Sequence, residues 1–293
     1  MKLGLFAMIG AVAEPMAIMK TLAQRSEQRG FSTVWVPEHV VLVEKYASRY
    51  PYSETGAFPG STTATIADPF ISLTAMACAT SKIRLATGIC LVPEHNPIVL
   101  AKVVATLDWL CGGRVVLGAG IGWLEEEFHA IGIPWERRAA RTKECVEAMR
   151  RLWADALSSY RGEFVNFEGV RSYPKPVRGS VPVIFGGESG PALKRSADYG
   201  NGWFGFNVSP DEAVAKVKRI EEILRINGRK RSELEIIVAP YTKPATPDDL
   251  KRYRDGGVDE VVIVNPRAPR TVQEAEALAD DTARKWMEAA ANC

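Results

Sequence analysis

The chain has 293 residues, of which 46% are hydrophobic and 25% are charged, and its formal net charge is +2. These values are average for a globular protein, and the absence of basic runs argues against nucleic acid as a partner. No stretch approaches the roughly 18 consecutive apolar residues of a membrane span, so no membrane partner is expected. The five cysteines are widely spaced and lack zinc-ligand spacing, which indicates reduced thiols in a cytoplasmic protein.

Apolar runs and helical patterns alternate along the whole chain. Eight strands are predicted, and a helical segment follows each of them. The predicted strands are 2–7, 31–36, 83–91, 114–117, 181–185, 201–206, 234–239 and 258–264. This count predicts an α/β fold, a (β/α)8 TIM barrel made by a single domain over residues 1–293. A doubly wound open sheet is the alternative, and it is disfavoured because no GxGxxG follows the first strand.

Residues 83–123 show the strand–helix–strand unit most clearly. An apolar strand is followed by a polar connection and by Pro97, a residue typical of the first helical position. Apolar residues then recur at helical spacing until Gly112, and the next strand runs into a glycine-rich end at 118–122. Glycines at a strand end let the backbone approach a ligand closely.

Two segments interrupt this alternation. Residues 40–66, after the second strand, are rich in aromatic residues, prolines and glycines and are too long for a plain connection, so we expect a lid-like insertion within the domain. Residues 155–181, before the fifth strand, form a second insertion in which a hairpin is predicted around 164–167.

Functional side chains in such a barrel lie where the strands end. Glu38 and His39 follow the second strand, and an imidazole there can donate a hydrogen bond or shuttle a proton near neutral pH. A structural histidine beside an ordinary salt bridge of Glu38 is the alternative. His95 is expected to brace the helix that starts after it, and His129 is expected at the surface. No spacing among these residues predicts a metal site.

The turn at 186–190, after the fifth strand, is the most informative loop. Gly186, Gly187 and Gly190 allow amide groups to point at a ligand, Ser189 adds a hydroxyl, and a helix starts immediately afterwards. A helix N-terminus with free amides suits a phosphate, although a ligand-free turn is an equal alternative. Glu188 would repel an anion, so its side chain is expected to point outward.

The sequence contains no nucleophile elbow, P-loop or metalloprotease helix. This absence favours a bound cofactor that carries the chemistry while the protein binds and orients it.

Three fragments carry a resemblance to a known family. They are GFSTVWVPEH (30–39), LATGICLVPEHNPIVLAKVVATLDWLCGGRVVLGAGIGW (85–123) and PVIFGGESGPALKRSADYGNGWF (182–204). In this order and spacing they resemble the luciferase-like monooxygenase superfamily over nearly the whole chain. The stretch VEKYASRYPYSETGAFP is similar to the lid of a subgroup that uses the deazaflavin coenzyme F420. The resemblance implies a TIM barrel, a deazaflavin cofactor and, often, a homodimer formed through barrel helices.

The resemblance also implies site residues. Glu38 and His39 match an acidic–histidine pair that contacts the reactive part of the deazaflavin ring, with glutamate where aspartate is common. A bulge that backs the ring, often with a non-proline cis peptide bond, matches Thr87, Gly88 and Ile89.

The family's phosphate loop matches Gly187, Ser189 and Gly190, in agreement with the interpretation of this turn from its residues. Gly186 and Gly122, at two strand ends, complete the predicted cofactor-binding set. One departure concerns Trp123, which stands where deazaflavin sugar-phosphate dehydrogenases have a glutamate proton donor. Three glutamates, residues 125–127, follow it, and the proton donor is unassigned.

The leading hypothesis is therefore an F420-dependent oxidoreductase. A hydride would pass between deazaflavin C5 and a small organic substrate under the lid, with His39 and Glu38 as catalytic residues and a separate cofactor-reducing enzyme as a partner. An FMN-dependent monooxygenase served by a reductase is the second hypothesis. A barrel that binds a cofactor without turnover is the third.

Overall fold

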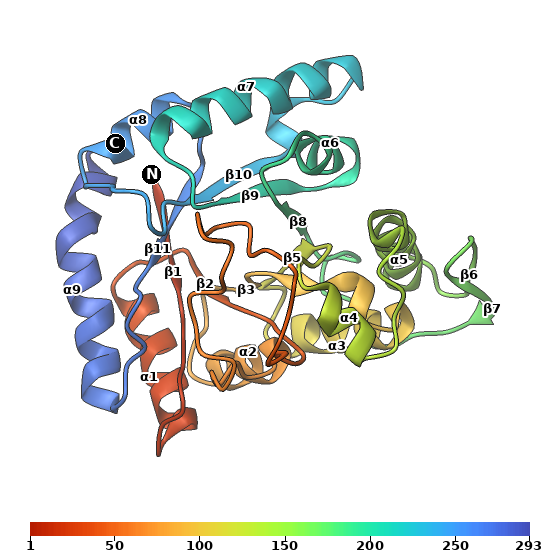
Figure 1. Cartoon of the computed structure of the whole chain (residues 1–293), viewed down its shortest axis with the longest axis horizontal. Helices are drawn as coiled ribbons and strands as arrows, with labels where there is room; N and C mark the ends of the chain where they lie inside the picture. Colours follow the sequence, from red (N-terminus) through yellow and green to blue (C-terminus); the bar gives the residue numbers. More distant parts are fainter.

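The computed structural model describes all 293 residues and contains a closed barrel of parallel strands (Figure 1). Neighbouring barrel strands follow the chain order, and the pairing of the third with the fourth closes the ring. The barrel strands are β1 (Lys2–Phe6), β2 (Thr33–Val36), β3 (Arg84–Thr87), β5 (Val115–Gly120), β8 (Val183–Gly186), β9 (Gly202–Phe206), β10 (Glu235–Ala239) and β11 (Glu260–Val264). The predicted (β/α)8 barrel and all eight predicted strands are confirmed.

Helices surround the barrel, and most begin where the sequence places a cap or a proline. They are α1 (Pro15–Gln28), α2 (Pro69–Ala77), α3 (Pro97–Leu110), α4 (Glu125–Ala130), α5 (Arg138–Ala154), α6 (Gly190–Tyr199), α7 (Pro210–Ile226), α8 (Asp249–Asp255) and α9 (Val272–Ala291). Asp68, Asn96 and Ser189 cap α2, α3 and α6 by accepting hydrogen bonds from backbone amides of the first turn. These bonds satisfy amides that have no partner within a helix.

Two apolar cores hold the barrel together. The larger lies between strands and helices, and the smaller fills the barrel interior with side chains such as Trp35 and Phe204. The rings of these two residues stack with centroids 4.7 Å apart. The interior is therefore solid, and open space for a ligand is confined to the ends of the barrel.

The N-terminal end of the barrel is closed by a paired charge cluster. Glu260, at the start of β11, is fully buried and accepts hydrogen bonds from Arg84, Trp35 Nε1 and Thr33 Oγ1. Arg84 also pairs with Glu235, at 2.7 Å. Every charge in this cluster has an opposite partner, which is what burial of ionised groups requires.

The two predicted insertions have different structures. The second forms an antiparallel hairpin of β6 (Ser158–Arg161) and β7 (Asn166–Val170), which projects from the barrel next to α5 (Figure 1). The first, residues 40–66, contains neither helix nor strand and runs as an orange segment through the middle of the view in Figure 1. No helix of the structure is both long and apolar enough to cross a membrane.

Candidate active site at the C-terminal end of the barrel

A histidine–carboxylate pair lies where β2 ends. His39 Nδ1 is 2.8 Å from Glu127 Oε2, and Glu127 is only 1% exposed. The other oxygen of Glu127 accepts hydrogen bonds from the amides of Val40 and Val41, at 2.7 and 3.1 Å. The buried carboxylate of α4 thus fixes the imidazole through Nδ1 and leaves Nε2 for another partner. This pairing supports the catalytic interpretation of His39.

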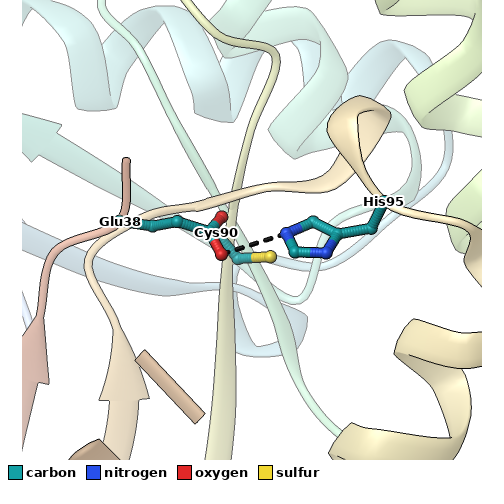
Figure 2. Close-up of side chains that lie close together, drawn as sticks. All are labelled: Glu38, Cys90 and His95. Atoms are coloured by element: carbon teal, nitrogen blue, oxygen red, sulfur yellow. Dashed lines mark hydrogen bonds and ion pairs between the residues drawn. The ribbon is translucent and has the colours of Figure 1, made fainter. Parts of the chain in front are cut away.

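Glu38 turns away from His39. Its side chain is buried, one oxygen accepts a hydrogen bond from the Leu91 amide, and the other lies 3.0 Å from His95 Nε2 (Figure 2). The expectation that His95 braces the start of α3 is wrong, because Asn96 caps the helix while the His95 ring binds Glu38. Burial lowers the pKa of His95, but the hydrogen bond and charge of Glu38 more than offset this and leave it raised.

Cys90, in the short strand β4 (Cys90–Leu91), completes a cluster with Glu38 and His95 whose potential ligand atoms lie within 4.8 Å of one another (Figure 2). Burial comes first among the effects that raise the pKa of the Cys90 thiol well above its usual value. Both Glu38 oxygens already have hydrogen-bond partners. These hydrogen bonds tie the end of β2 to the segment after β3, and we call the cluster of Glu38, Cys90 and His95 the clamp.

The site contains a third buried glutamate in addition to Glu38 and Glu127. Glu94, in the 3-10 turn η1 (Val92–Glu94), is 8% exposed, and neither of its side-chain oxygens has a hydrogen-bond partner. Burial, followed by the charges of Glu127 and Glu38, raises the pKa of Glu94 to about 9. The site therefore contains one carboxyl group that is neutral at pH 7 next to two carboxyls with hydrogen-bond donors.

The predicted ring-backing segment crosses the barrel mouth. The Gly88–Ile89 peptide bond is cis, as the resemblance predicts, and Thr87 Oγ1 donates to the Gly118 carbonyl at 2.7 Å. The Ile89 side chain occupies the space that a Cβ would need at Gly186, on the opposite strand β8. Ile89 thereby forms part of the floor of the mouth.

The glycine turn opens at the same end of the barrel. Gly187 has a φ of +107°, and Ser189 and Gly190 are exposed at the N-terminus of α6. Ser189 Oγ accepts a hydrogen bond from the Ala192 amide at 3.4 Å, so its own hydrogen remains available as a donor. The structure thus leaves the predicted anion-binding face of the turn open to solvent.

Glu188 does not point outward, which corrects the expectation from the sequence. Its Oε1 accepts a hydrogen bond from the Phe206 amide at 2.8 Å, because that amide at the end of β9 needs an acceptor. Tyr52 of the lid also bonds this carboxyl. Burial raises the pKa of Glu188 to about 7 despite both hydrogen bonds, so near neutrality this carboxyl carries only part of its charge.

Two arginines beside the turn lack a carboxylate partner. Arg195 of α6 is 8% exposed and its Nε has no hydrogen-bond partner, while Arg138 of α5 reaches only the Gly122 carbonyl, at 3.5 Å, and the ring of Trp135. Burial lowers the pKa of both; at Arg138 the charge of Glu125 opposes this shift and the charge of Arg195 adds to it. Guanidinium groups that form no salt bridge can bind a phosphate.

Aromatic residues of the lid pack over His39. Trp123, after β5, stacks with Phe58 at a centroid distance of 6.1 Å and contacts Tyr50 edge-on at 5.2 Å. The His39 ring lies 5.9 Å from Trp123, also edge-on. Tyr52 extends the same cluster to Phe206, 5.0 Å away on the far side of the mouth. These rings give the site an apolar roof.

The lid is attached to α4 by its backbone. Glu126 Oε1 accepts hydrogen bonds from the amides of Ala47 and Ser48, at 2.5 and 3.2 Å, and Ser48 Oγ accepts from the Glu125 amide. Residues 40–66, identified from composition alone, therefore lie directly over the predicted catalytic residue. A lid function in catalysis stays a prediction.

The structure brings most of the predicted site residues to one end of the barrel, with differences in role. Gly122 has a φ of +78° and faces Phe128 and Glu94, so its place is behind the site, next to the carboxyl cluster. Reasoning from sequence missed Arg138 and Arg195, gave Glu94 no role and left Glu127 within an unassigned run. The acidic run 125–127 was the signal available for Glu127, because it follows shortly after the end of β5.

Comparison with known proteins provides independent evidence. The family model described as luciferase-like monooxygenase matches residues 1–292. The uncharacterized protein Rv0953c of Mycobacterium tuberculosis is 38% identical over 269 residues, which cover 90% of this chain and 92% of that protein. The 5,10-methylenetetrahydromethanopterin reductase of Archaeoglobus fulgidus is 27% identical over 267 residues, covering 91% of this chain and 72% of that protein.

Solved structures share the fold at low sequence identity. The coenzyme F420-dependent tetrahydromethanopterin reductase of Methanopyrus kandleri superposes with a TM-score of 0.74 at 17% identity, covering 98% of both chains. The monooxygenase RslO1 of Streptomyces bottropensis gives 0.77 at 20% identity, with 98% of this chain and 99% of that chain covered. The fold is thus common to deazaflavin enzymes and monooxygenases, and it does not separate the two.

Proposed function

Because the chain belongs to the luciferase-like monooxygenase family, we propose that it is an F420-dependent oxidoreductase that transfers a hydride between deazaflavin C5 and a small organic substrate. The observation that carries the proposal is the arrangement at the barrel mouth. A histidine fixed by a buried carboxylate lies at the same end of the barrel as a glycine turn that begins α6, the helix that carries the unpaired guanidinium of Arg195. The first suits proton transfer, and the second suits the phosphate of a cofactor.

The residues present fit such a cofactor. The exposed amide of Gly190, the hydroxyl of Ser189 and the guanidinium groups of Arg138 and Arg195 would hold its phosphate. Ile89 would lie against its ring. The bound deazaflavin supplies or accepts the hydride, and the chain supplies the proton, the orientation and the exclusion of water.

His39 is the proposed proton carrier. Because its Nδ1 is held by Glu127, its Nε2 is the atom that gives a proton to the substrate heteroatom in the reducing direction, or takes it in the oxidising direction. The sequence predicts that Glu38 shares this catalytic role. Its bonds to Leu91 and His95 support a positioning role instead, in which it fixes the backbone on either side of the mouth.

Cofactor binding tests the choice between deazaflavin and flavin. Titration of the purified apo-protein with F420 and with FMN, followed by fluorescence or calorimetry, is expected to give micromolar or tighter binding of F420 and much weaker binding of FMN. The reverse order would favour the second hypothesis, an FMN-dependent monooxygenase. Binding without turnover on a broad panel of carbonyl, imine and alkene substrates would favour a non-catalytic barrel. An active enzyme implies a separate cofactor-reducing partner for repeated reduction.

A homodimer is the second part of the proposal. Helices α2 and α3 expose apolar side chains side by side, including Ile71 at 70%, Val99 at 61% and Leu110 at 61%. A self-complementary apolar face of two helices suits a second copy related by a two-fold axis. Light scattering of the wild type should give twice the mass of 32.1 kDa. Val99→Glu should shift it to the monomer, whereas the exposed substitution Leu157→Glu, on the hairpin side, should not.

A further inference from the structure

Glu94 is the one buried carboxyl of the site to which the proposed mechanism assigns no role. Its side chain is nine-tenths buried, yet neither oxygen accepts or donates a hydrogen bond. An unpartnered buried polar group costs free energy, so its retention calls for a physical explanation. The N-terminal cluster shows that this fold accommodates buried glutamates by pairing them with arginine, and Glu94 has no such partner.

The surroundings of Glu94 contain two carboxylates, a thiol and no cation directed at it. The negative charges of Glu127 on α4 and of Glu38 after β2 both act on Glu94, and Cys90 lies in β4, which leads directly into the turn of Glu94. A Cβ at Gly122 would lie 3.4 Å from Glu94 Oε1, which places the carboxyl against the segment that leads into α4. Arg138 of α5 points to the Gly122 carbonyl and the Trp135 ring, not to Glu94.

The acceptor capacity of Glu127 supplies the complementary observation. Its Oε1 takes two amide hydrogen bonds and its Oε2 takes only His39 Nδ1, which leaves one lone-pair position of a buried carboxylate without a donor. A neutral Glu94 has one O–H to donate and no partner that competes for it. The unmatched donor lies against the segment that leads into α4, and the unmatched acceptor lies on α4 itself.

We propose that Glu94 is a neutral carboxylic acid that positions and stabilises the His39–Glu127 pair by turning its O–H toward Glu127 when His39 has released its proton. The catalytic part of this statement rests on the proposed function. The Nε2–H bond of protonated His39 breaks and a bond from hydrogen to the substrate heteroatom forms, so the pair loses one positive charge. The Glu127 carboxylate then remains buried beside a neutral imidazole, and a hydrogen bond from Glu94 lowers the cost of that state.

Substitution by glutamine distinguishes this role from a purely structural one. A glutamine at this position keeps a neutral side chain of the same shape with N–H donors, so Glu94→Gln should retain kcat at pH 7 within about twofold. Glu94→Leu removes the donor and should lower kcat about tenfold or more with little change in KM, as expected when one hydrogen bond to a charged group is lost. Glu168→Gln, on the exposed hairpin strand β7, is the control and should leave both constants unchanged.

The pH profile gives a second readout. Wild-type activity should fall as the pH rises through about 9, because an ionised Glu94 cannot donate and adds a negative charge next to Glu127. Glu94→Gln should lack this fall. Equal kcat values for the glutamine and leucine variants, or an unchanged alkaline fall in Glu94→Gln, would overturn the proposal.

A measurement on the cofactor-free protein separates this inference from the proposed function. The chain has only three histidines, so each imidazole gives its own signal in an NMR titration. The His39 signal should show a step near pH 9 in the wild type that is missing in Glu94→Gln, while the exposed His129 shows none in either protein. If His39 lacks the step in the wild type, the coupling is refuted whatever the enzyme's activity. If the step is present and turnover is absent, only the proposed function fails.

Discussion

The two ends of this barrel handle buried glutamates in opposite ways. At the N-terminal end, Glu260 is fully buried and Arg84 binds it, together with two neutral donors. At the C-terminal end, Glu94 is almost as deeply buried and binds nothing, while Glu127 binds a histidine and two amides. One cluster is complete and serves stability. The other is incomplete, as expected where groups must change protonation state or accept a ligand.

Removal of His39 should produce the largest effect on function. His39→Ala is expected to lower kcat/KM about 10²–10⁴-fold, the usual contribution of a positioned proton carrier, with a melting temperature close to that of the wild type. The comparison is with His95→Ala, which loses the bond to Glu38 but no proton carrier and should retain most of the activity. Similar losses in both variants would show that packing at the barrel mouth, and not proton transfer, is what His39 contributes.

Loss of Arg84 should have the largest effect on stability. Arg84→Met leaves Glu260 and Glu235 without their main cation and is expected to reduce the free energy of unfolding by about 3–5 kcal/mol, the range for breaking a buried ion pair. Chemical denaturation measures this loss. Because the cluster lies at the opposite end from His39, the activity per folded molecule should stay near that of the wild type.

A substitution of Arg195 should separate stability from binding. Arg195→Met removes a buried guanidinium that has no counter-charge, so the apo-protein should be as stable as the wild type or more stable. Cofactor affinity should nevertheless fall at least tenfold, since a hydrogen bond to a charged group is worth about 1.5–3 kcal/mol. Arg141→Met is the control, because Arg141 lies on α5 near Arg138 but donates to the Pro134 carbonyl. An apo-protein that Arg195→Met destabilises would identify Arg195 as a structural residue.

The smallest expected effect is the pH dependence of stability at Glu94. The native pKa of about 9 lies above the ordinary value of 4.5, so the native state holds a proton that the unfolded state loses between these limits. Stability contributed by Glu94 should therefore decrease as the pH rises through this window. Glu94→Gln should gain in melting temperature over the wild type at pH 8 relative to pH 5. An equal difference at both pH values would contradict the shift.

The barrel could be predicted because its signals are local and repeat along the chain. Each strand is an apolar run, and helix starts such as Asp68-Pro69 and Asn96-Pro97 carry a cap and a proline. His39 could be proposed because a strand end in this fold faces the site. The gap in sequence between His39 and its partner Glu127 is 88 residues, so no spacing rule connects them.

The parts of the site that the sequence did not predict include buried side chains with polar atoms that have no hydrogen-bond partner. Nothing in the chain around Arg195 or Glu94 indicates that these side chains are buried without partners, because that property emerges only when several elements pack together. Glu188 and His95 show the same limit in the other direction. Each was assigned from its neighbours in sequence, whereas its actual partner, Phe206 or Glu38, lies on another strand end.

Helix α4 connects the lid to His39, so these two parts of the site are mechanically coupled. It is only six residues long, and two adjacent glutamates within it hold different parts of the molecule: Glu126 binds the backbone of residues 47 and 48, and Glu127 binds the imidazole of His39. Any shift of this short helix therefore displaces the roof and the proton carrier together. If His39 carries the proton as proposed, opening the roof and displacing the imidazole from its place would be a single movement.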